Sequence, residues 1–253
     1  MANSEIIFGK HAIDAILKKA PERVLELFVH QDRDDERVLK MAMHAARFGV
    51  HVKEVSKQEI TKLAGTATHQ GVIARIRTQP ALRDNELEDL LDELDQAEQV
   101  PFLLVLDTVT DPHNLGACLR SADAAGVHGV IAPKDKSVGL NATVRKVASG
   151  AAETIPFFQV TNLARTLEKL QSRGIWCIGT ALSEEAKVIY QVDLKGPLAI
   201  VMGAEGTGLR RLTAEVCDQL AYIPMAGEVA SLNVSVATGI CLFEALRQRQ
   251  QTL

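Results

Sequence analysis

Six short apolar segments recur along residues 102–253, and helical spacing of apolar positions separates them. A continuous apolar run of roughly four to eight residues is typical of a strand that is buried on both faces of a sheet. The expected strands are 102–107, 129–133, 155–160, 175–181, 198–203 and 220–224, and the expected helices are 115–125, 142–149, 163–172, 209–217 and 234–247. This alternation predicts an α/β fold with a parallel sheet covered by helices on both faces.

A second, smaller α/β pattern occupies residues 1–77. Short apolar runs at 6–8, 24–29, 50–55 and 71–76 predict strands, and the charged stretch 36–47 predicts a helix. Ser56 followed by Glu59 has the form of a capping box, so we expect a helix to begin there and to run through Leu63. We predict that residues 1–77 form a domain separate from residues 102–253.

The region 78–101 joins the two patterns and is strongly acidic. It has a proline near each end, and its leucines at 82, 87, 90, 91 and 94 have near-helical spacing. This pattern predicts an acidic linker that contains a short amphipathic helix with a solvated charged face. We expect the linker to act as a spacer that lies away from any nucleic acid.

Charge is distributed unevenly along the chain, which has 253 residues, a formal net charge of −4 and 47% hydrophobic residues. The hydrophobic content excludes a disordered protein. Residues 1–80 carry a charge of +3, residues 81–101 carry −7, and residues 102–253 are neutral. Because the acidity is confined to the predicted linker, an RNA partner is compatible with both flanking domains.

Neither a membrane anchor nor a metal or disulfide framework is indicated. No stretch approaches the roughly 18 apolar residues of a membrane helix, and the start lacks a signal-peptide pattern, so we expect a soluble, unprocessed cytoplasmic protein. Cys118, Cys177, Cys217 and Cys241 lack CxxC or metal-ligand spacing. We expect Cys118, Cys177 and Cys241 to be small core residues.

Three polar or glycine-rich segments follow predicted strand ends, where open parallel sheets bind ligands. The first, residues 107–120, reads DTVTDPHNLGACLR. We expect a turn at 111–112 and a helix start near Asn114, which could serve as its cap. Arg120 is expected near the interior of an otherwise apolar helix, where a guanidinium requires an anion or a carbonyl partner. A structural salt bridge and a functional role are equally open for Arg120.

The second segment, residues 202–209, reads MGAEGTGL. Its glycines permit positive φ angles and a close approach of backbone to ligand. It lacks the lysine and the spacing of a phosphate-binding loop, and it does not match the G-x-G-x-x-G fingerprint. Glu205 would repel a triphosphate but suits a cationic ligand such as S-adenosylmethionine, which carries a sulfonium and an amino group.

The third segment, residues 223–235, reads IPMAGEVASLNVS and leads into a predicted helix. Capping would explain one of Ser231, Asn233 and Ser235 but hardly all three, which favours a functional use. Other enzyme patterns are absent from the sequence: there is no G-x-S-x-G elbow and no H-E-x-x-H. His113 and His128 are therefore expected to be structural or exposed.

In this order the three segments resemble the motifs of the SpoU (TrmH) family of RNA ribose 2′-O-methyltransferases, a branch of the SPOUT superfamily. The matching patterns are D-x-x-x-D-P-x-N-x-G-x-x-x-R, M-G-x-E-G-x-G and I-P-M-x-G-x-x-x-S-L-N-V-S. Residues 1–77 resemble the family's substrate-binding domain of the L30e/L7Ae type, so the resemblance covers nearly the whole chain. Within the family, the chain is most similar to the bacterial enzymes that methylate a guanosine of large-subunit rRNA.

The resemblance implies a fold and a reaction that the hydrophobic pattern does not. It implies a carboxyl-terminal deep trefoil knot that holds the cofactor, and a site completed across a homodimer. The pattern alone predicts an ordinary doubly wound sheet, because chain connections are normally unknotted. The implied methyl donor is S-adenosylmethionine, without a metal, and the implied acceptor is a guanosine ribose 2′-OH in the peptidyl-transferase region of 23S rRNA.

The resemblance also assigns roles to individual residues. The reacting end is assigned to Asn114, Arg120, Glu205, Ser231 and Asn233, and the cofactor to Thr180, Gly203, Ile223, Met225 and Leu232. Arg120 is the family's suspected base, although a guanidinium pKa above about 12 makes stabilisation of the alkoxide at least as plausible. Candidate RNA contacts are Lys10, Arg75, Arg77, Lys134, Lys136, Arg145 and Lys146.

Three other functions remain open. A tRNA guanosine 2′-O-methyltransferase of the same family is disfavoured by the separate amino-terminal domain. A non-catalytic RNA-binding ribosome-assembly factor would be distinguished by a failure to bind S-adenosylmethionine. A nicotinamide-dependent dehydrogenase is disfavoured by the missing fingerprint.

Overall fold

The computed structural model describes residues 4–31, 35–78, 81–204 and 206–251. The chain divides into two compact units. Unit 1 comprises Met1–Pro80 and Leu140–Thr154, and unit 2 comprises Ala81–Gly139 and Ile155–Leu253. These limits differ from the predicted boundaries at 77 and 101 in two places: residues 81–101 belong to unit 2, and residues 140–154 belong to unit 1.

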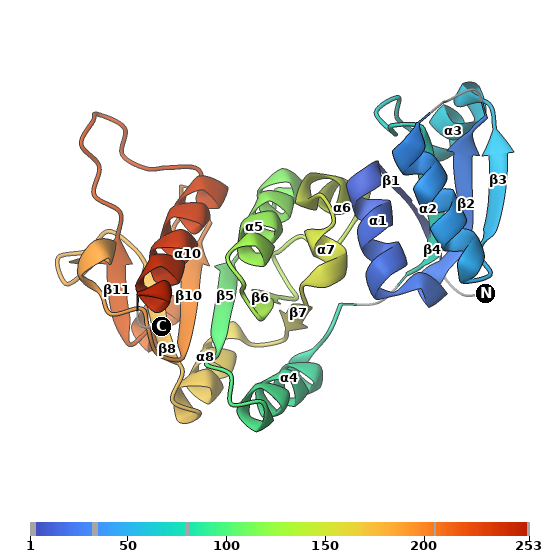
Figure 1. The fold of residues 1–253 in the computed structure, drawn as a ribbon. Helices are drawn as coiled ribbons and strands as arrows, with labels where there is room; N and C mark the ends of the chain where they lie inside the picture. The colour runs from blue at the N-terminus through green and yellow to red at the C-terminus, as the bar shows by residue number, and fades with distance from the viewer. Residues whose placement is uncertain (1–3, 32–34, 79–80, 205, 252–253) are drawn as a thin grey trace. The chain divides into compact units, whose positions relative to one another are not determined.

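Unit 1 contains a four-stranded sheet in the order β1-β4-β2-β3 (Figure 1). Its elements are β1 (Ser4–Phe8), α1 (Lys10–Lys19), η1 (Pro21–Arg23), β2 (Val24–His30), α2 (Glu36–Arg47), β3 (His51–Val55), α3 (Lys57–Ala64), β4 (Val72–Arg77), α6 (Ala142–Ala148) and α7 (Ala151–Thr154). Apolar residues of α1 and α2 pack on one face of the sheet, and those of α3 pack on the other. The predicted cap is confirmed, because the side chain of Ser56 accepts a hydrogen bond from the Glu59 backbone N–H at 3.3 Å.

An ionic cluster attaches α6 and α7 to the rest of unit 1. Arg145 is only 3% exposed and forms ion pairs with Glu5, at 3.2 Å, and with Glu153. Arg23 pairs with the same Glu153 at 3.1 Å. A buried guanidinium requires such partners. The expectation that Arg145 contacts RNA is therefore wrong, because carboxylates of this chain already surround it.

Unit 2 is built on a seven-stranded sheet in the order β7-β6-β5-β10-β8-β11-β9. All of its strand pairs are parallel, which confirms the predicted sheet type. The elements are α4 (Asp84–Gln96), β5 (Phe102–Asp107), α5 (Pro112–Ala124), β6 (Gly129–Pro133), β7 (Phe157–Val160), α8 (Leu163–Ser172), β8 (Trp176–Thr180), β9 (Lys187–Val188), η2 (Ile189–Gln191), β10 (Leu198–Gly203), α9 (Arg211–Val216), β11 (Gln219–Tyr222) and α10 (Val234–Gln250).

Helices cover both faces of this sheet. Apolar residues of α4, α8 and α9 pack on the face that contains Leu103, Val105 and Val201. On the other face, α10 packs against β10 and lies beside α5 (Figure 1). The trefoil knot concerns how the chain threads rather than which strands pair, and it stays a prediction.

The acidic segment is a docked helix rather than a spacer. The predicted amphipathic helix is present as α4, and its Leu87 and Leu91 are buried at 3% and 2% exposure. The charged side of α4 is also engaged, since Lys169 of α8 donates a hydrogen bond to Glu88 at 3.0 Å and Arg173 pairs with Asp92. Burial of the leucine stripe explains why this segment belongs to unit 2 and is not a linker.

The cysteines and the apolar content of the helices agree with the sequence. Cys118, Cys177 and Cys241 are buried as predicted. Burial raises the pKa of Cys118 to about 11 and that of Cys241 to about 12, so both thiols stay protonated at neutral pH. None of the helices in the described part of the chain has the length and apolar character to cross a membrane.

We expect Leu91→Ala to lower the free energy of unfolding of the protein by about 3 kcal/mol, because it leaves a cavity in the core of unit 2. The measurement is urea denaturation followed by circular dichroism. Glu93→Ala, on the exposed side of the same helix, should change stability by less than about 0.5 kcal/mol. Equal, small effects of both substitutions would show that α4 does not pack on the unit.

Candidate active site

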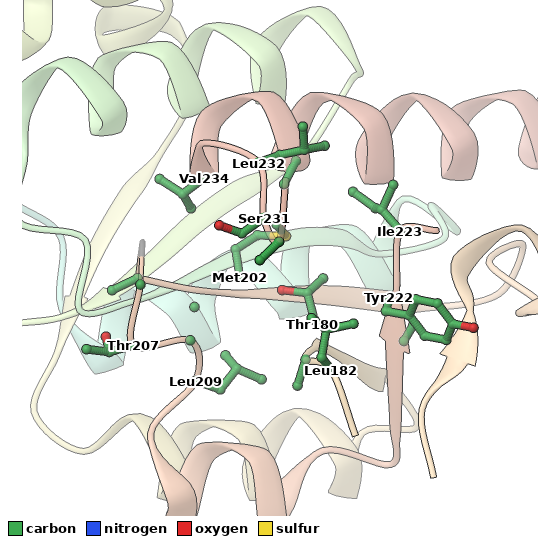
Figure 2. Close-up of a pocket in the computed structure, with 18 of the residues that line it drawn as sticks. Thr180, Leu182, Met202, Thr207, Leu209, Tyr222, Ile223, Ser231, Leu232 and Val234 are labelled. Carbon is green, nitrogen blue, oxygen red and sulfur yellow. The ribbon is translucent and has the colours of Figure 1, made fainter. Parts of the chain in front are cut away.

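A pocket of about 590 Å³ opens where β8, β10 and β11 end (Figure 2). Parallel neighbours bring the loops at their carboxyl ends to one edge of the sheet. The lining comes from four stretches of chain around these ends: Thr180, Ala181 and Leu182; Met202, Gly203, Ala204, Gly206, Thr207, Gly208 and Leu209; Ala221, Tyr222, Ile223 and Met225; and Ala230, Ser231, Leu232, Val234 and Ala237. The walls are therefore mostly apolar, with a few hydroxyl groups.

All five residues predicted to hold a cofactor line this single pocket: Thr180, Gly203, Ile223, Met225 and Leu232. Ser231, predicted for the reacting end, also lines it, and Figure 2 shows its side chain beside the pocket. Sequence reasoning missed Leu182, Thr207 and Tyr222. Their signal was position alone, because each lies at or just beyond the end of a strand.

The segment after β10 folds tightly on itself. Ala204 and Gly208 exchange two backbone hydrogen bonds, of 3.1 and 2.9 Å. A Cβ on Gly203 would lie 2.2 Å from the carbonyl carbon of Gly208, so only glycine fits there. Gly208 itself has a φ of 67°, a conformation that glycine adopts without strain. Glu205, predicted for the reacting end, lies outside the described residues.

Two predicted residues meet between the first turns of α5 and α10. Asn233 donates a hydrogen bond from Nδ2 to Oδ1 of Asn114 at 2.9 Å. Asn233 also caps α10, because its Oδ1 accepts the Ser235 backbone N–H at 2.9 Å and the Ser235 hydroxyl at 2.6 Å. Helix capping therefore explains the positions of Asn233 and Ser235. Ser231 takes no part in the cap and lines the pocket.

Asn114 does not cap α5, as the sequence had suggested. The helix begins at Pro112, and its cap is Asp111, whose side chain accepts the His113 backbone N–H at 3.0 Å. This bond holds the pKa of Asp111 below its usual value. Because the helix starts three residues earlier than expected, Asn114 lies within the first turn, where its side chain reaches Asn233.

Arg120 lies apart from the pocket lining. Leu119, just before it, is fully buried, but the helix turns by about 100° per residue, so Arg120 leaves the apolar stripe and is exposed. Among the described residues, no hydrogen bond or ion pair involves the Arg120 side chain. Within the described residues, the structural salt bridge that the sequence left open is therefore not formed, and the Arg120 side chain is exposed.

The two lone histidines are structural or exposed, as predicted. Nδ1 of His128 accepts the Phe102 backbone N–H at 3.1 Å, and burial lowers the pKa of His128. His113 is exposed near the start of α5. In the described part of the chain, no group of three or more His, Cys, Asp or Glu side chains is arranged to hold a metal ion. The expected metal-free reaction stays a prediction.

Comparison with known proteins gives the family. Residues 101–243 match the profile described as SpoU rRNA Methylase family, and residues 6–82 match the one described as RNA 2′-O ribose methyltransferase substrate binding. The chain belongs to the SpoU family. The resemblance found in its three motifs is thereby confirmed.

Individual SpoU relatives are similar over nearly the whole chain. The 23S rRNA (guanosine-2′-O-)-methyltransferase RlmB of Shewanella oneidensis is 57% identical over 250 residues, covering 99% of this chain and 100% of the relative. The enzyme of that name in Escherichia coli is 56% identical over 246 residues, covering 97% and 99%. An AdoMet-bound rRNA methyltransferase from Sinorhizobium meliloti superposes with a TM-score of 0.77 at 28% identity, covering 96% of this chain and 87% of that one.

We expect Gly203→Ala to lower the free energy of unfolding by about 2 kcal/mol, because the new methyl group would displace the backbone of Gly208. Differential scanning calorimetry and urea denaturation provide the measurement. In the control Gly227→Ala, the added Cβ would meet no atom within 4 Å. A Gly203→Ala protein as stable as this control would contradict the tight loop.

Proposed function

We propose that this protein transfers a methyl group from S-adenosylmethionine to the ribose 2′-OH of a guanosine in the peptidyl-transferase region of 23S rRNA. The observation that carries the proposal is the convergence on one pocket of the cofactor residues of the second and third strand-end segments and of Thr180 at the end of β8. The two RlmB relatives, which are more than half identical over almost their whole length, support the choice of substrate.

The pocket fits S-adenosylmethionine in size and chemistry. Small-molecule sites enclose about 300–1,000 Å³ and combine apolar walls with a few polar groups. Ile223 and Leu232 would hold the cofactor together with the backbone around Thr180 and Met225. The bare backbone at Gly203 leaves space that a side chain would fill. When bound, S-adenosylmethionine supplies an electrophilic methyl group on its sulfonium.

The residues of the chain must act on a weakly acidic alcohol. Asn114 and Asn233 are fixed by their mutual hydrogen bond and would orient the ribose 2′-OH. Arg120 would stabilise the negative charge that develops on the 2′ oxygen and contact a phosphate, since a guanidinium with a pKa above about 12 is a poor base. Ser231, and with it Glu205, would shape the cofactor end or relay the proton.

A second copy of the chain would complete the site. Within one chain Arg120 is exposed, has no partner among the described residues and is absent from the pocket lining. We propose a homodimer in which Arg120 of one copy serves the pocket of the other. Both the pocket and Arg120 belong to unit 2, so this unit is the expected site of dimerisation.

Both units would contribute to RNA binding. The protein would encounter 23S rRNA in the cytoplasm. The substrate-binding match of residues 6–82 supports this role for unit 1. Of the candidate contacts, Arg77, Lys134, Lys136 and Lys146 are exposed. Lys10 and Arg75 are already paired with Asp35 and Glu26. Phosphate contacts by such side chains would make rRNA binding weaken as salt rises.

Arg120→Ala should reduce methyl transfer at least about 100-fold, because it removes the cation expected to stabilise the 2′ oxygen. Binding of S-adenosylmethionine, measured by calorimetry, should be unchanged. The matched control is Arg165→Ala, which removes another exposed arginine of unit 2. Near-native transfer by the Arg120→Ala protein would exclude both roles proposed for Arg120.

The acceptor is tested by transfer of radiolabelled methyl groups to unmodified 23S rRNA and, in parallel, to unmodified bulk tRNA. We expect label on 23S rRNA alone, mapped to one guanosine ribose. Label on tRNA alone would support the proposed methyl transfer but show that the acceptor is tRNA and not 23S rRNA. If neither RNA is labelled and S-adenosylmethionine does not bind, the protein is an RNA-binding assembly factor instead.

A further inference from the structure

We propose that Asp107 is a positioning residue for methyl transfer: its buried carboxylate holds the loop 203–210 in the conformation that forms one wall of the cofactor pocket. The inference rests on the proposed function, because it assigns the pocket to S-adenosylmethionine. It adds a residue that lies outside the pocket lining and acts through Arg210.

Asp107 is the last residue of β5, and its side chain is fully buried. It pairs in the sheet with Gly203, where the loop begins. Both carboxylate oxygens bind the residue that ends the loop: Oδ2 accepts the backbone N–H of Arg210 at 2.9 Å, and Oδ1 accepts its Nε–H at 2.6 Å. A single side chain of the neighbouring strand therefore holds the far end of the loop.

The described residues of the loop between these two points are held by further contacts. Two backbone hydrogen bonds join Ala204 to Gly208 near the start and the end of the loop. Only Leu209 lies between Gly208 and Arg210. Six of its residues line the pocket: Gly203, Ala204, Gly206, Thr207, Gly208 and Leu209. Because Asp107 holds Arg210, the adjacent Leu209 is also held in place before a ligand binds.

A carboxylate at this position requires a reason, because a buried charge is costly unless it is paired and hydrogen-bonded. Leucine precedes Asp107 in β5, and the strand is otherwise apolar. Charge-assisted hydrogen bonds are stronger than neutral ones, so the pair holds the loop more firmly than an amide would. A wall that is ordered in advance spares the ligand the cost of ordering it.

Asp107 also connects the pocket to the reacting end. Its main chain continues through four residues to Pro112, where α5 begins, and that helix carries Asn114 and Arg120. The same residue therefore anchors the cofactor loop by its side chain and leads to the catalytic helix by its backbone.

The test is Asp107→Asn, which keeps the size of the side chain but removes its charge and one of its two acceptor oxygens. We expect the Kd for S-adenosylmethionine, measured by calorimetry on the full-length protein, to rise about tenfold, which corresponds to about 1.4 kcal/mol. The KM for S-adenosylmethionine should rise by a similar factor. The KM for 23S rRNA, and kcat at saturating cofactor, should change less than about threefold.

A matched control separates positioning from general loss of stability. Glu244 is another buried carboxylate of unit 2 that is paired with an arginine, at 2.8 Å from Arg247, and it does not line the pocket. Glu244→Gln should lower the Tm without changing the Kd for S-adenosylmethionine. Arg210→Ala keeps the backbone N–H bond to Asp107, so it should weaken binding less than Asp107→Asn, and the double variant should be no weaker than Asp107→Asn alone.

The outcomes are distinguishable. If the unmodified protein binds S-adenosylmethionine and Asp107→Asn binds it equally well, the positioning role is wrong. Equal weakening by Asp107→Asn and Glu244→Gln would also overturn it, because the effect would then reflect stability. If Asp107→Asn does not fold, Arg210→Ala decides: an unchanged Kd refutes the role, and a raised Kd supports it. If the unmodified protein does not bind S-adenosylmethionine, the proposed function fails instead.

Discussion

The parallel alignment of β5, β10 and β8 is the constraint on which the site depends. Because β10 lies between the other two strands and runs in the same direction, all three end at one edge of the sheet. Thr180 and Gly203 are thereby brought to the same pocket from different loops. Any antiparallel neighbour at this point would send one of these loops to the opposite edge.

The two halves of the site have different physical characters. The proposed cofactor half lies within one chain, and the described residues of its loop are held by backbone hydrogen bonds and by the ion pair of the buried Asp107 with Arg210. The reacting half ends at an exposed side chain, Arg120, which extends from a helix whose opposite face is buried. In the proposed mechanism, a group that meets a large RNA and a second copy of the chain would have to lie at the surface.

Net charge is a poor guide to the surface that RNA would meet. Much of the acidity is on α4, where Glu88 is paired with Lys169 of α8 and Asp92 with Arg173, which directly follows α8. Arg145, in contrast, counts as a cation in the sequence but is enclosed by carboxylates in unit 1. Partners within the fold decide which charges remain available for phosphate groups.

Local pattern determined the elements and the motif residues of this protein. The helix 36–47 and the cap at Ser56 follow from contacts a few residues apart, and the residues that the family resemblance assigns to the cofactor line one pocket. Tertiary structure alone decided the hydrogen bond between Asn114 and Asn233, the packing of α4 and the exposure of Arg120. These features depend on which helix faces meet, and such contacts join residues that are far apart in the sequence.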